Sequence, residues 1–400
     1  MQNELLPFLR TELEGTTPQL EQVIRTLEWV RVEEHIKGGW MGFGRPPRER
    51  CDLARAFVAK AVLGFETTRE LIERLSVDTR LKRICGFSFY KKLPSEATFS
   101  RAFAEFAASA LAARVHKILI EETLGNQLIG HVSRDSTAIH ARERVHVPQK
   151  NVAPVPLLPI EALCQTPAVS VSAESAAAAA MVIAENTPVS EEPPSAAETT
   201  PAPVQRRGRP RKGETRPAPP LGKVATQRTQ TLPQILAAIP TECDIGTKKN
   251  AKGFKESWKG YKLHLDTADC GVPLNALVSS ASMHDSLAAI PLAISTAQRV
   301  TSFYDLMDAA YCSQDIRAHS VSLGHVPLID HNPRGGKKIE FLPHEAERYK
   351  ERSQAERMNA RLKDEFGLRQ IWVRGGEKVS NHVNFAVLAL AADQLMRLLR

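Results

Sequence analysis

Four polar residues with chemically distinct side chains stand at a helical spacing near the C-terminus. Tyr349, Arg352, Glu356 and Lys363 lie at offsets of 0, 3, 7 and 14 in the stretch YKERSQAERMNARLK. An α-helix turns about 100° per residue, so these offsets fall at roughly 0°, −60°, −20° and −40°, on one narrow stripe. The apolar residues of this stretch fall on the neighbouring arc. The spacing therefore predicts a helix that aligns a phenol, a guanidinium, a carboxylate and an ammonium group at the border of a core.

Two aspartates elsewhere in the chain could bind divalent metal ions together with Glu356. Asp135 lies near the exit of the predicted strand QLIGHVSRDSTAIHA, and Asp308 ends the short apolar strand in SFYDLMDAAY. Hard divalent cations prefer carboxylate oxygens. Two such ions about 4 Å apart can activate the attacking oxygen and stabilise the leaving oxygen of a phosphodiester. The three carboxylates therefore form a candidate catalytic site for phosphodiester chemistry.

Each of these carboxylates also has an ordinary structural explanation. An aspartate at a strand exit often caps a turn or a helix. The pair Arg352–Glu356, four residues apart, stabilises a solvated helix by about 0.2–0.5 kcal/mol. Asp305, Asp266 and Asp285 are competing carboxylates in the same region. The residues alone therefore leave the choice of the second aspartate open.

The spacing Tyr-x2-Arg-x3-Glu-x6-Lys resembles the Y-(2)-R-(3)-E-(6)-K signature of a large superfamily of bacterial insertion-sequence DDE transposases. The stretches RDSTAIHA, GYKLHL, VSSASMHDS and DAAY are similar to the blocks around the first two catalytic aspartates of that family. The stretch LPSEATFSRAF resembles the end of the family's N-terminal domain. The resemblance extends over nearly the whole chain except a low-complexity insert.

The resemblance implies a catalytic role for three carboxylates. Asp135, Asp308 and Glu356 would be the catalytic residues and the metal ligands, and Asp308 is favoured over Asp305 because Ala-Ala-Tyr follows it, as in the family. The implied cofactor is Mg²⁺, as two ions, with Mn²⁺ able to substitute. The implied reaction is hydrolysis at transposon ends, followed by attack of the freed 3′-hydroxyl on target DNA.

The resemblance also implies DNA contacts. Tyr349, Arg352 and Lys363 would hold phosphates of the transposon end, with the arginine as a forked donor and the lysine as a point charge. The partner would be double-stranded DNA, both terminal inverted repeats and target, bound by a homodimer. Two alternatives are a DNA-binding regulator that keeps the fold without activity, and a metal-dependent nuclease that cuts DNA but cannot join it.

Helical periodicity predicts an all-helical domain over residues 1–125, and the resemblance implies that this domain binds DNA. Lys91 and Lys92 come just before its last helix, and Arg101 lies in the second turn of that helix. Cations that flank a helix start are typical of an element that enters a DNA groove. The alternative is an ordinary helical domain with solvated charges.

The periodicity changes near residue 128 and predicts an α/β catalytic domain in two pieces, 126–145 and 244–400. Strands come first and are followed by alternating helices and strands, which indicates a mixed sheet covered by helices. The resemblance specifies a ribonuclease-H-like sheet that is interrupted after its first strand.

Residues 146–243 separate the two pieces and are rich in Ala, Pro, Ser, Thr and Glu. This composition cannot bury enough apolar surface to offset chain entropy, so we expect disorder. Residues 206–228 hold eight lysines and arginines, and Arg207 and Arg209 lie in the stretch RRGRPRKGE. That stretch resembles an AT-hook, whose arginines enter the narrow minor groove of A·T tracts. A basic linker that only adds nonspecific affinity is the alternative.

The composition of the whole chain fits these predictions. The 400 residues include 53 lysines and arginines against 45 acidic residues, a formal charge of +8 that suits a polyanionic partner. The six cysteines form no CxxC pair, which favours a reducing compartment and argues against a zinc site. No signal peptide and no apolar run of about 18 residues is evident. We therefore expect a cytoplasmic, nucleoid-associated protein that does not contact the membrane.

Overall fold

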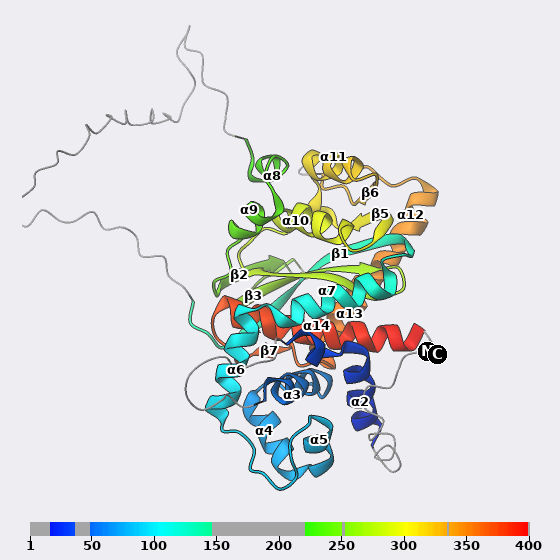
Figure 1. The fold of residues 1–400 in the computed structure, drawn as a ribbon. Coiled ribbons are helices and arrows are strands. Elements are labelled where there is room, and N and C mark those ends of the chain that lie inside the picture. Colours follow the sequence, from blue (N-terminus) through cyan, green and yellow to red (C-terminus); the bar gives the residue numbers. More distant parts are fainter. Residues whose placement is uncertain (1–16, 37–48, 146–220, 250–252, 334–335, 399–400) are drawn as a thin grey trace, which may run out of the picture. The chain divides into compact units, whose positions relative to one another are not determined.

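The fold is known from a computed structural model, which describes residues 17–36, 49–145, 221–249, 253–333 and 336–398. The described residues belong to one compact unit (Figure 1). Within it a mixed sheet is covered by helices on both faces, and a further group of helices lies beyond one of the two helical layers. The chain is thus a mixed α/β protein.

The described residues form a seven-stranded sheet with the order β2-β3-β1-β5-β6, in which β4 pairs with β3 and β7 with β1. The strands are β1 (Leu128–Ala141), β2 (Asp244–Lys249), β3 (Lys255–Ala268), β4 (Pro273–Ser280), β5 (Thr301–Met307), β6 (Val326–Ile329) and β7 (Gln370–Ile371). Pairing is antiparallel for β1–β3 and β3–β4, and parallel for β1–β5 and β5–β6. The central strand β1 therefore joins an antiparallel half to a parallel half.

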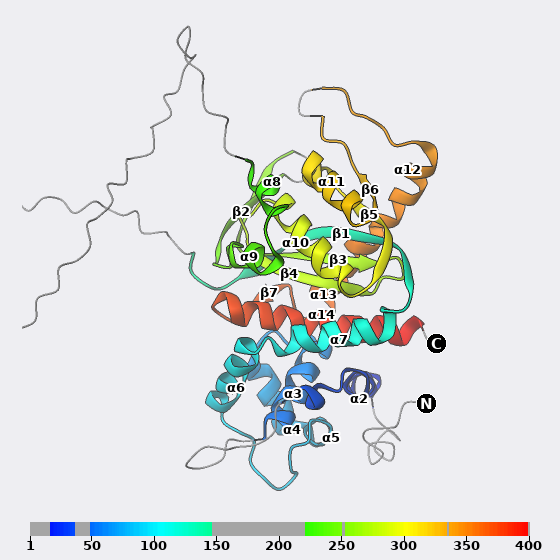
Figure 2. The same cartoon turned by 45° about the horizontal axis from the view of Figure 1, so that its top comes forward.

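Two groups of helices cover the faces of this sheet (Figures 1 and 2). On one face lie α8 (Lys223–Gln227), α9 (Leu232–Ala237), α10 (Ser286–Ala297) and α11 (Gln314–Ser322). On the other lie α7 (Leu111–Leu124), α13 (Ser353–Asp364) and α14 (Gly376–Leu398). α13 packs across β1 and β3, which brings its residues close to the centre of the sheet.

The N-terminal helices pack against α14 on the side opposite the sheet (Figure 2). They are α2 (Pro18–Val30), the 3₁₀ turn η2 (Val32–His35), α3 (Arg50–Val62), α4 (Thr68–Val77), α5 (Thr79–Ile84) and α6 (Glu96–Ala108). Phe385 of α14 meets Phe57 and Phe103 with ring centroids 6.0 and 6.4 Å apart. One hydrophobic core therefore runs from these helices through α14 to the sheet.

The packed structure resumes earlier than the predicted end of the insert. Residues 221–243 fall within the segment 146–243 that we expected to be disordered, yet they contain α8 and α9 and belong to the compact unit. The reason is apolar packing: Ile239 is buried in a small cluster with Ala288 and Leu292 of α10, and Ile235 is buried on α9, which contacts α10. The prediction for this part of the insert was wrong, and Arg207 and Arg209 lie outside the described residues.

The helix predicted through residues 349–363 is interrupted. The chain forms α12 (Pro343–Tyr349), a 3₁₀ turn η5 (Lys350–Arg352) and then α13. A 3₁₀ turn rotates by about 120° per residue, so Arg352 is turned by about 60° from the position it would have in a straight α-helix. Tyr349 ends α12, Arg352 ends η5, and Glu356 and Lys363 lie on α13, where the Glu356 side chain stays 57% exposed.

Candidate active site

The parallel register between β1 and β5 places Asp135 and Asp308 side by side. The last pair in this register is Arg134 with Met307, and the two aspartates are the next residue on each strand. Asp135 was predicted near the exit of its strand, but it lies inside β1, because β1 continues to Ala141 along β3. The pairing with β5, however, ends just before it. Asp308 directly follows β5 and is the N-cap of the 3₁₀ turn η4 (Ala309–Tyr311), where its side chain accepts a hydrogen bond from the Ala310 N–H at 3.0 Å.

Residues of η5 and α13 contact the Asp135 carboxylate directly. Asn359 Nδ2 donates to Asp135 Oδ2 at 3.0 Å, and Arg352 Nη1 lies 3.5 Å from Asp135 Oδ1. Arg352 also donates through Nη2 to Glu356 Oε1. Arg352 thus bridges the partly buried aspartate of β1 and the exposed glutamate of α13. The structure brings together Asp135, Asp308, Arg352 and Glu356 from four separate elements.

The electrostatics of the site favour a cation. Burial raises the pKa of Asp135 from 3.8 to about 6, Arg352 opposes this increase, and the nearby charges of Asp308 and Glu356 add to it. Burial also raises the pKa of Asp308, and Asp285 contributes in the same direction. Two partly buried carboxylates therefore lie together with incomplete charge compensation, which a divalent ion would supply.

The competing carboxylates are each engaged in structural contacts. Asp305 is buried and accepts hydrogen bonds from Ser320 and from His325 Nδ1, the latter at 3.1 Å. Burial alone would raise the pKa of Asp305, but the hydrogen bond from His325 and the charge of Arg134 lower it. Such a carboxylate is stable as an anion without a metal ion. This geometry favours Asp308 over Asp305 as the second aspartate.

The other two competitors are also paired. Asp266 is buried with Arg134, whose Nε and Nη2 donate to its two oxygens at 2.7 Å each. Asp285 forms an ion pair with Lys262 Nζ at 2.9 Å. The Arg134–Asp266 pair joins β1 to β3 directly behind Asp135, so it fixes the strand that carries the candidate ligand.

Tyr349 and Lys363 border the carboxylates. The Tyr349 ring packs on Phe341 with centroids 4.7 Å apart, and the Arg352 guanidinium lies 5.9 Å from the Tyr349 centroid. Burial raises the pKa of Tyr349 to about 12, so the phenol keeps its proton. Burial and then the charge of Lys248 lower the pKa of Lys363, while Asp135 opposes the change. The charges of Lys248 and of Asp135 thus act on Lys363 in opposite directions.

Two residues near the site were missed by sequence reasoning. Asn359 lies on the buried face of α13 together with Ala355, Met358 and Leu362. A polar amide at an apolar position is a sequence signal that could have identified this residue. Lys248 lies on β2, more than 100 residues from Lys363 in the sequence, and no local pattern connects the two. Strand pairing between β2 and β3 is needed to bring it near.

The residues predicted to contact DNA in the N-terminal helical domain lie on different elements from the three candidate carboxylates. Lys91 and Lys92 are exposed in the loop before α6, and Arg101 is exposed on α6, where its Nε donates to the Ala97 carbonyl at 3.3 Å. The structure does not bring these three cations together with Asp135 or Asp308.

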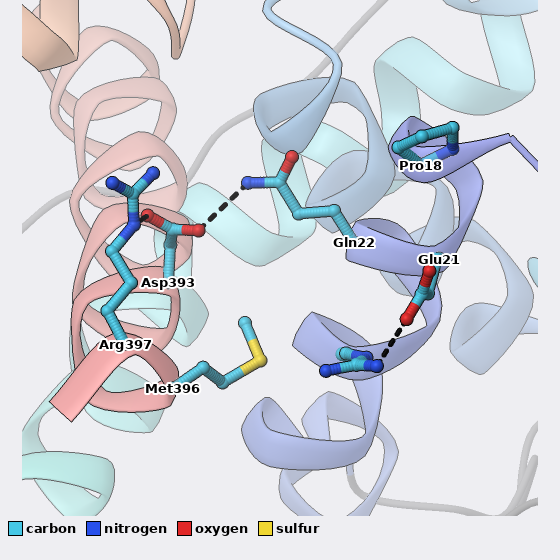
Figure 3. A pocket seen from close by; sticks show the side chains of 7 residues that line it. Pro18, Glu21, Gln22, Asp393, Met396 and Arg397 are labelled. Atoms are coloured by element: carbon cyan, nitrogen blue, oxygen red, sulfur yellow. Dashed lines mark hydrogen bonds and ion pairs between the residues drawn. The ribbon is translucent and has the colours of Figure 1, made fainter. Parts of the chain in front are cut away.

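A polar pocket between α2 and α14 is also distinct from the carboxylates (Figure 3). Asp393 in its wall accepts hydrogen bonds from Gln22 at 3.0 Å and from Arg361 at 2.6 Å, and Arg397 Nε lies 2.9 Å away. These groups satisfy one another and hold α2 and α13 to α14. We therefore assign the pocket a structural role.

The carboxylates suit hard metal ions by chemistry, although they are not arranged as a closed ligand cage. Among the described residues, no group of three His, Cys, Asp or Glu side chains already surrounds a common point. Arg352 accounts for this, since its guanidinium lies between Asp135 and Glu356. Asp135 and Asp308 could hold a metal ion directly, whereas Glu356 must first part from Arg352.

The chain thus combines a mixed sheet, two aspartates next to each other on neighbouring strands and a glutamate on a following helix. In comparison with known families, residues 10–105 match the Transposase domain (DUF772), and residues 239–392 match the Transposase DDE domain. The second match includes Asp308 and Glu356, and the first includes Lys91, Lys92 and Arg101. The chain belongs to the insertion-sequence DDE transposases.

The other comparisons, with curated proteins and with solved structures, gave no match. Family membership implies an enzyme that cleaves or transfers DNA and uses divalent metal ions. None of the helices in the described ranges is both long and apolar enough to cross a bilayer.

Proposed function

We propose that this transposase hydrolyses phosphodiester bonds at the ends of its insertion sequence and then joins the freed 3′-hydroxyl to target DNA. The observation that carries the proposal is the register of β1 and β5, which places Asp135 beside Asp308 while Arg352 connects Asp135 to Glu356. Asp266 and Asp305 are compensated by buried structural contacts. Asp135 contacts Arg352 and Asn359, yet burial and the charges of Asp308 and Glu356 keep its pKa raised, which supports a role beside a divalent cation.

The strand arrangement supports a ribonuclease-H-like catalytic domain. The order β4-β3-β1-β5-β6 has three antiparallel strands followed by two strands parallel to the first, which is the topology of that fold. In the proposed organisation, residues 1–125 form the DNA-binding domain, and the catalytic domain consists of 126–145 and the part after the insert. We now place the end of the insert at residue 220, because residues 221–243 pack on α10.

Asp135, Asp308 and Glu356 would hold two Mg²⁺ ions, or Mn²⁺ in their place. Such ions activate the attacking oxygen and stabilise the leaving oxygen of a phosphodiester. Asn359 keeps the Asp135 carboxylate in one orientation through its hydrogen bond. No covalent bond between the chain and DNA is required, so no serine or tyrosine acts as a nucleophile.

Arg352, Tyr349 and Lys363 would bind phosphates of the transposon end. In the free protein Arg352 neutralises Asp135 and Glu356. When a phosphate enters, the forked guanidinium can turn to it and release Glu356 for the metal ions. Lys363 adds a point charge, and Lys248 beside it extends the positive surface along β2. The Arg352 switch would couple the assembly of the metal site to the arrival of DNA.

The proposed partners are terminal inverted repeats and target DNA in the nucleoid, bound by a homodimer so that two ends are processed together. Arg207 and Arg209 would add minor-groove contacts in A·T-rich DNA. Two narrower functions remain as alternatives: a regulator that only binds DNA, and a nuclease that cuts without joining.

A strand-transfer assay tests the proposal. The full chain is incubated with labelled duplex of the element's ends, a supercoiled target plasmid and Mg²⁺, and cut and joined products are resolved on a gel. We expect both products with the wild type and neither with Asp135→Ala, which should still bind the labelled duplex. Binding without cleavage by the wild type would support the regulator, and cleavage without joining would support the nuclease.

A further inference from the structure

The loop between α5 and α6 exposes two aromatic side chains. Tyr90 is 93% exposed and Phe89 54% exposed, and their rings meet edge to face with centroids 5.2 Å apart. A single exposed apolar side chain is ordinary, but two adjacent aromatic rings form a small apolar patch. We call residues 86–95, which contain this patch, the aromatic loop. It lies at the periphery of the N-terminal helices, on the side away from the sheet (Figures 1 and 2).

The surroundings of the aromatic loop are strongly basic. Residues 79–95 contain five lysines and arginines and no aspartate or glutamate. Lys91 and Lys92, which directly follow Tyr90, are both exposed. The patch therefore combines apolar rings with a positive potential, and a partner must match both properties.

The aromatic loop is held in place from three sides. Lys82 Nζ donates to the carbonyl oxygens of Phe89 and Lys91 at 3.1 and 2.8 Å. Phe87, at one end, is buried and packs on Phe99 with centroids 6.1 Å apart, and Leu93, at the other end, packs against the core. The tip thus points its rings outward from fixed ends. A prearranged loop loses less conformational entropy when it binds a partner.

We propose that Tyr90, supported by Phe89, stacks on an unstacked base of the transposon end while Lys91 and Lys92 hold the adjacent phosphates. Aromatic side chains stack on the π-face of any base, and apolar wedges of DNA-binding proteins open base steps in this way. A protein partner fits less well, because the cores of protein interfaces are depleted in lysine. The inference rests on the proposed function, since it assumes that the helical part binds the transposon end.

The test separates stacking from charge. Affinity of the full chain for a duplex of the element's end is measured in EDTA, which prevents cleavage, over a range of salt concentrations. We expect Tyr90→Ala to weaken binding between about fivefold and a hundredfold, the range for loss of one base–aromatic stack. The dependence of log affinity on log salt should keep its slope. Lys91→Ala and Lys92→Ala should each flatten that slope by about 0.9.

Two matched variants refine the result. Tyr90→Phe keeps the ring and should bind like the wild type. Phe303→Ala removes another aromatic side chain, 52% exposed on β5, and should leave affinity unchanged.

A fluorescent base locates the stacked position. When 2-aminopurine is placed at successive positions of the duplex, its fluorescence at one position should increase with the wild type and stay low with Tyr90→Ala. Because Tyr90 is almost fully exposed, its removal should not alter the fold, which circular dichroism can verify.

Three outcomes would overturn the inference. Tyr90→Ala could bind as tightly as the wild type, or Tyr90→Phe could lose as much affinity as Tyr90→Ala, which would assign the effect to the hydroxyl group. Tyr90→Ala could also change the oligomeric state without DNA, which would identify a protein interface. If the wild type itself bound neither terminal nor random duplex, the proposed function would fail instead.

Discussion

The Asp135 carboxylate should destabilise the metal-free protein at neutral pH. Its pKa is raised by burial from 3.8 to about 6 in the folded chain. Between these values the folded chain binds more protons than the unfolded chain, so stability falls as pH rises through this window. At 1.36 kcal/mol per pH unit, the difference corresponds to roughly 3 kcal/mol above pH 6. Asp135→Asn removes this ionisation and should therefore stabilise the folded protein.

A partial loss of hydrogen bonding reduces this gain. An asparagine offers one acceptor oxygen, so either Asn359 or Arg352 loses its partner at position 135. One such bond is worth about 1 kcal/mol. The net stabilisation expected for Asp135→Asn is therefore about 1–2 kcal/mol at pH 8, and it should vanish toward pH 4, where the wild-type carboxyl group is protonated.

Urea denaturation in EDTA at several pH values from 5 to 8 measures this difference. In a second series, Mg²⁺ replaces EDTA. The ion should stabilise the wild type and have little effect on Asp135→Asn, because only the folded wild type binds it tightly. Asp305→Asn is the matched control: its carboxylate has a lowered pKa, so this variant should be less stable than the wild type at pH 8. The reasoning is refuted if Asp135→Asn is less stable at pH 8, or if its advantage does not change with pH.

Three further predictions concern the remaining parts of the chain. Asp305→Ala should lower the free energy of unfolding by about 3 kcal/mol or more, because it breaks a buried charged network, and an unchanged urea midpoint would contradict this. Deleting residues 150–220 should leave the fold intact and flatten the salt dependence of nonspecific DNA binding. Deleting residues 150–243 should also destabilise the protein, because the apolar packing on α10 is lost. Equal thermal stability of the two deletion variants would count against placing the end of the insert at residue 220. Arg207→Ala with Arg209→Ala should weaken binding to A·T-rich duplex selectively, and an equal loss on G·C-rich duplex would leave only a generic basic linker.

Local patterns predicted much of the architecture. The change from helical to strand periodicity near residue 128 located β1, and the apolar stretch before Asp308 predicted β5 to within a residue. Both depend on short-range alternation of apolar and polar residues, which the sequence displays directly. Asp308 could therefore be assigned to a strand end before the pairing was known, whereas Asp135, predicted near a strand exit, lies inside β1.

The arrangement of the site depended on long-range contacts that the sequence does not display. A straight helix was predicted for residues 349–363, but η5 interrupts it, and Arg352 contacts Asp135. The competition between Asp305 and Asp308 could be judged structurally only when Ser320 and His325 were seen to satisfy Asp305. Strong composition bias also concealed α9, whose one buried residue, Ile235, follows a long segment without apolar periodicity.

The most direct test of the metal-binding claim is cleavage of a terminal duplex by Asp308→Cys with Mg²⁺ and with Mn²⁺. A thiolate is a poor ligand for Mg²⁺ and a better one for softer metal ions. If Asp308 holds a catalytic metal ion, this variant should be inactive with Mg²⁺ and regain part of its cleavage activity with Mn²⁺, whereas Asp308→Ala should stay inactive with both. Wild-type cleavage by Asp308→Ala with Mg²⁺ would contradict the account.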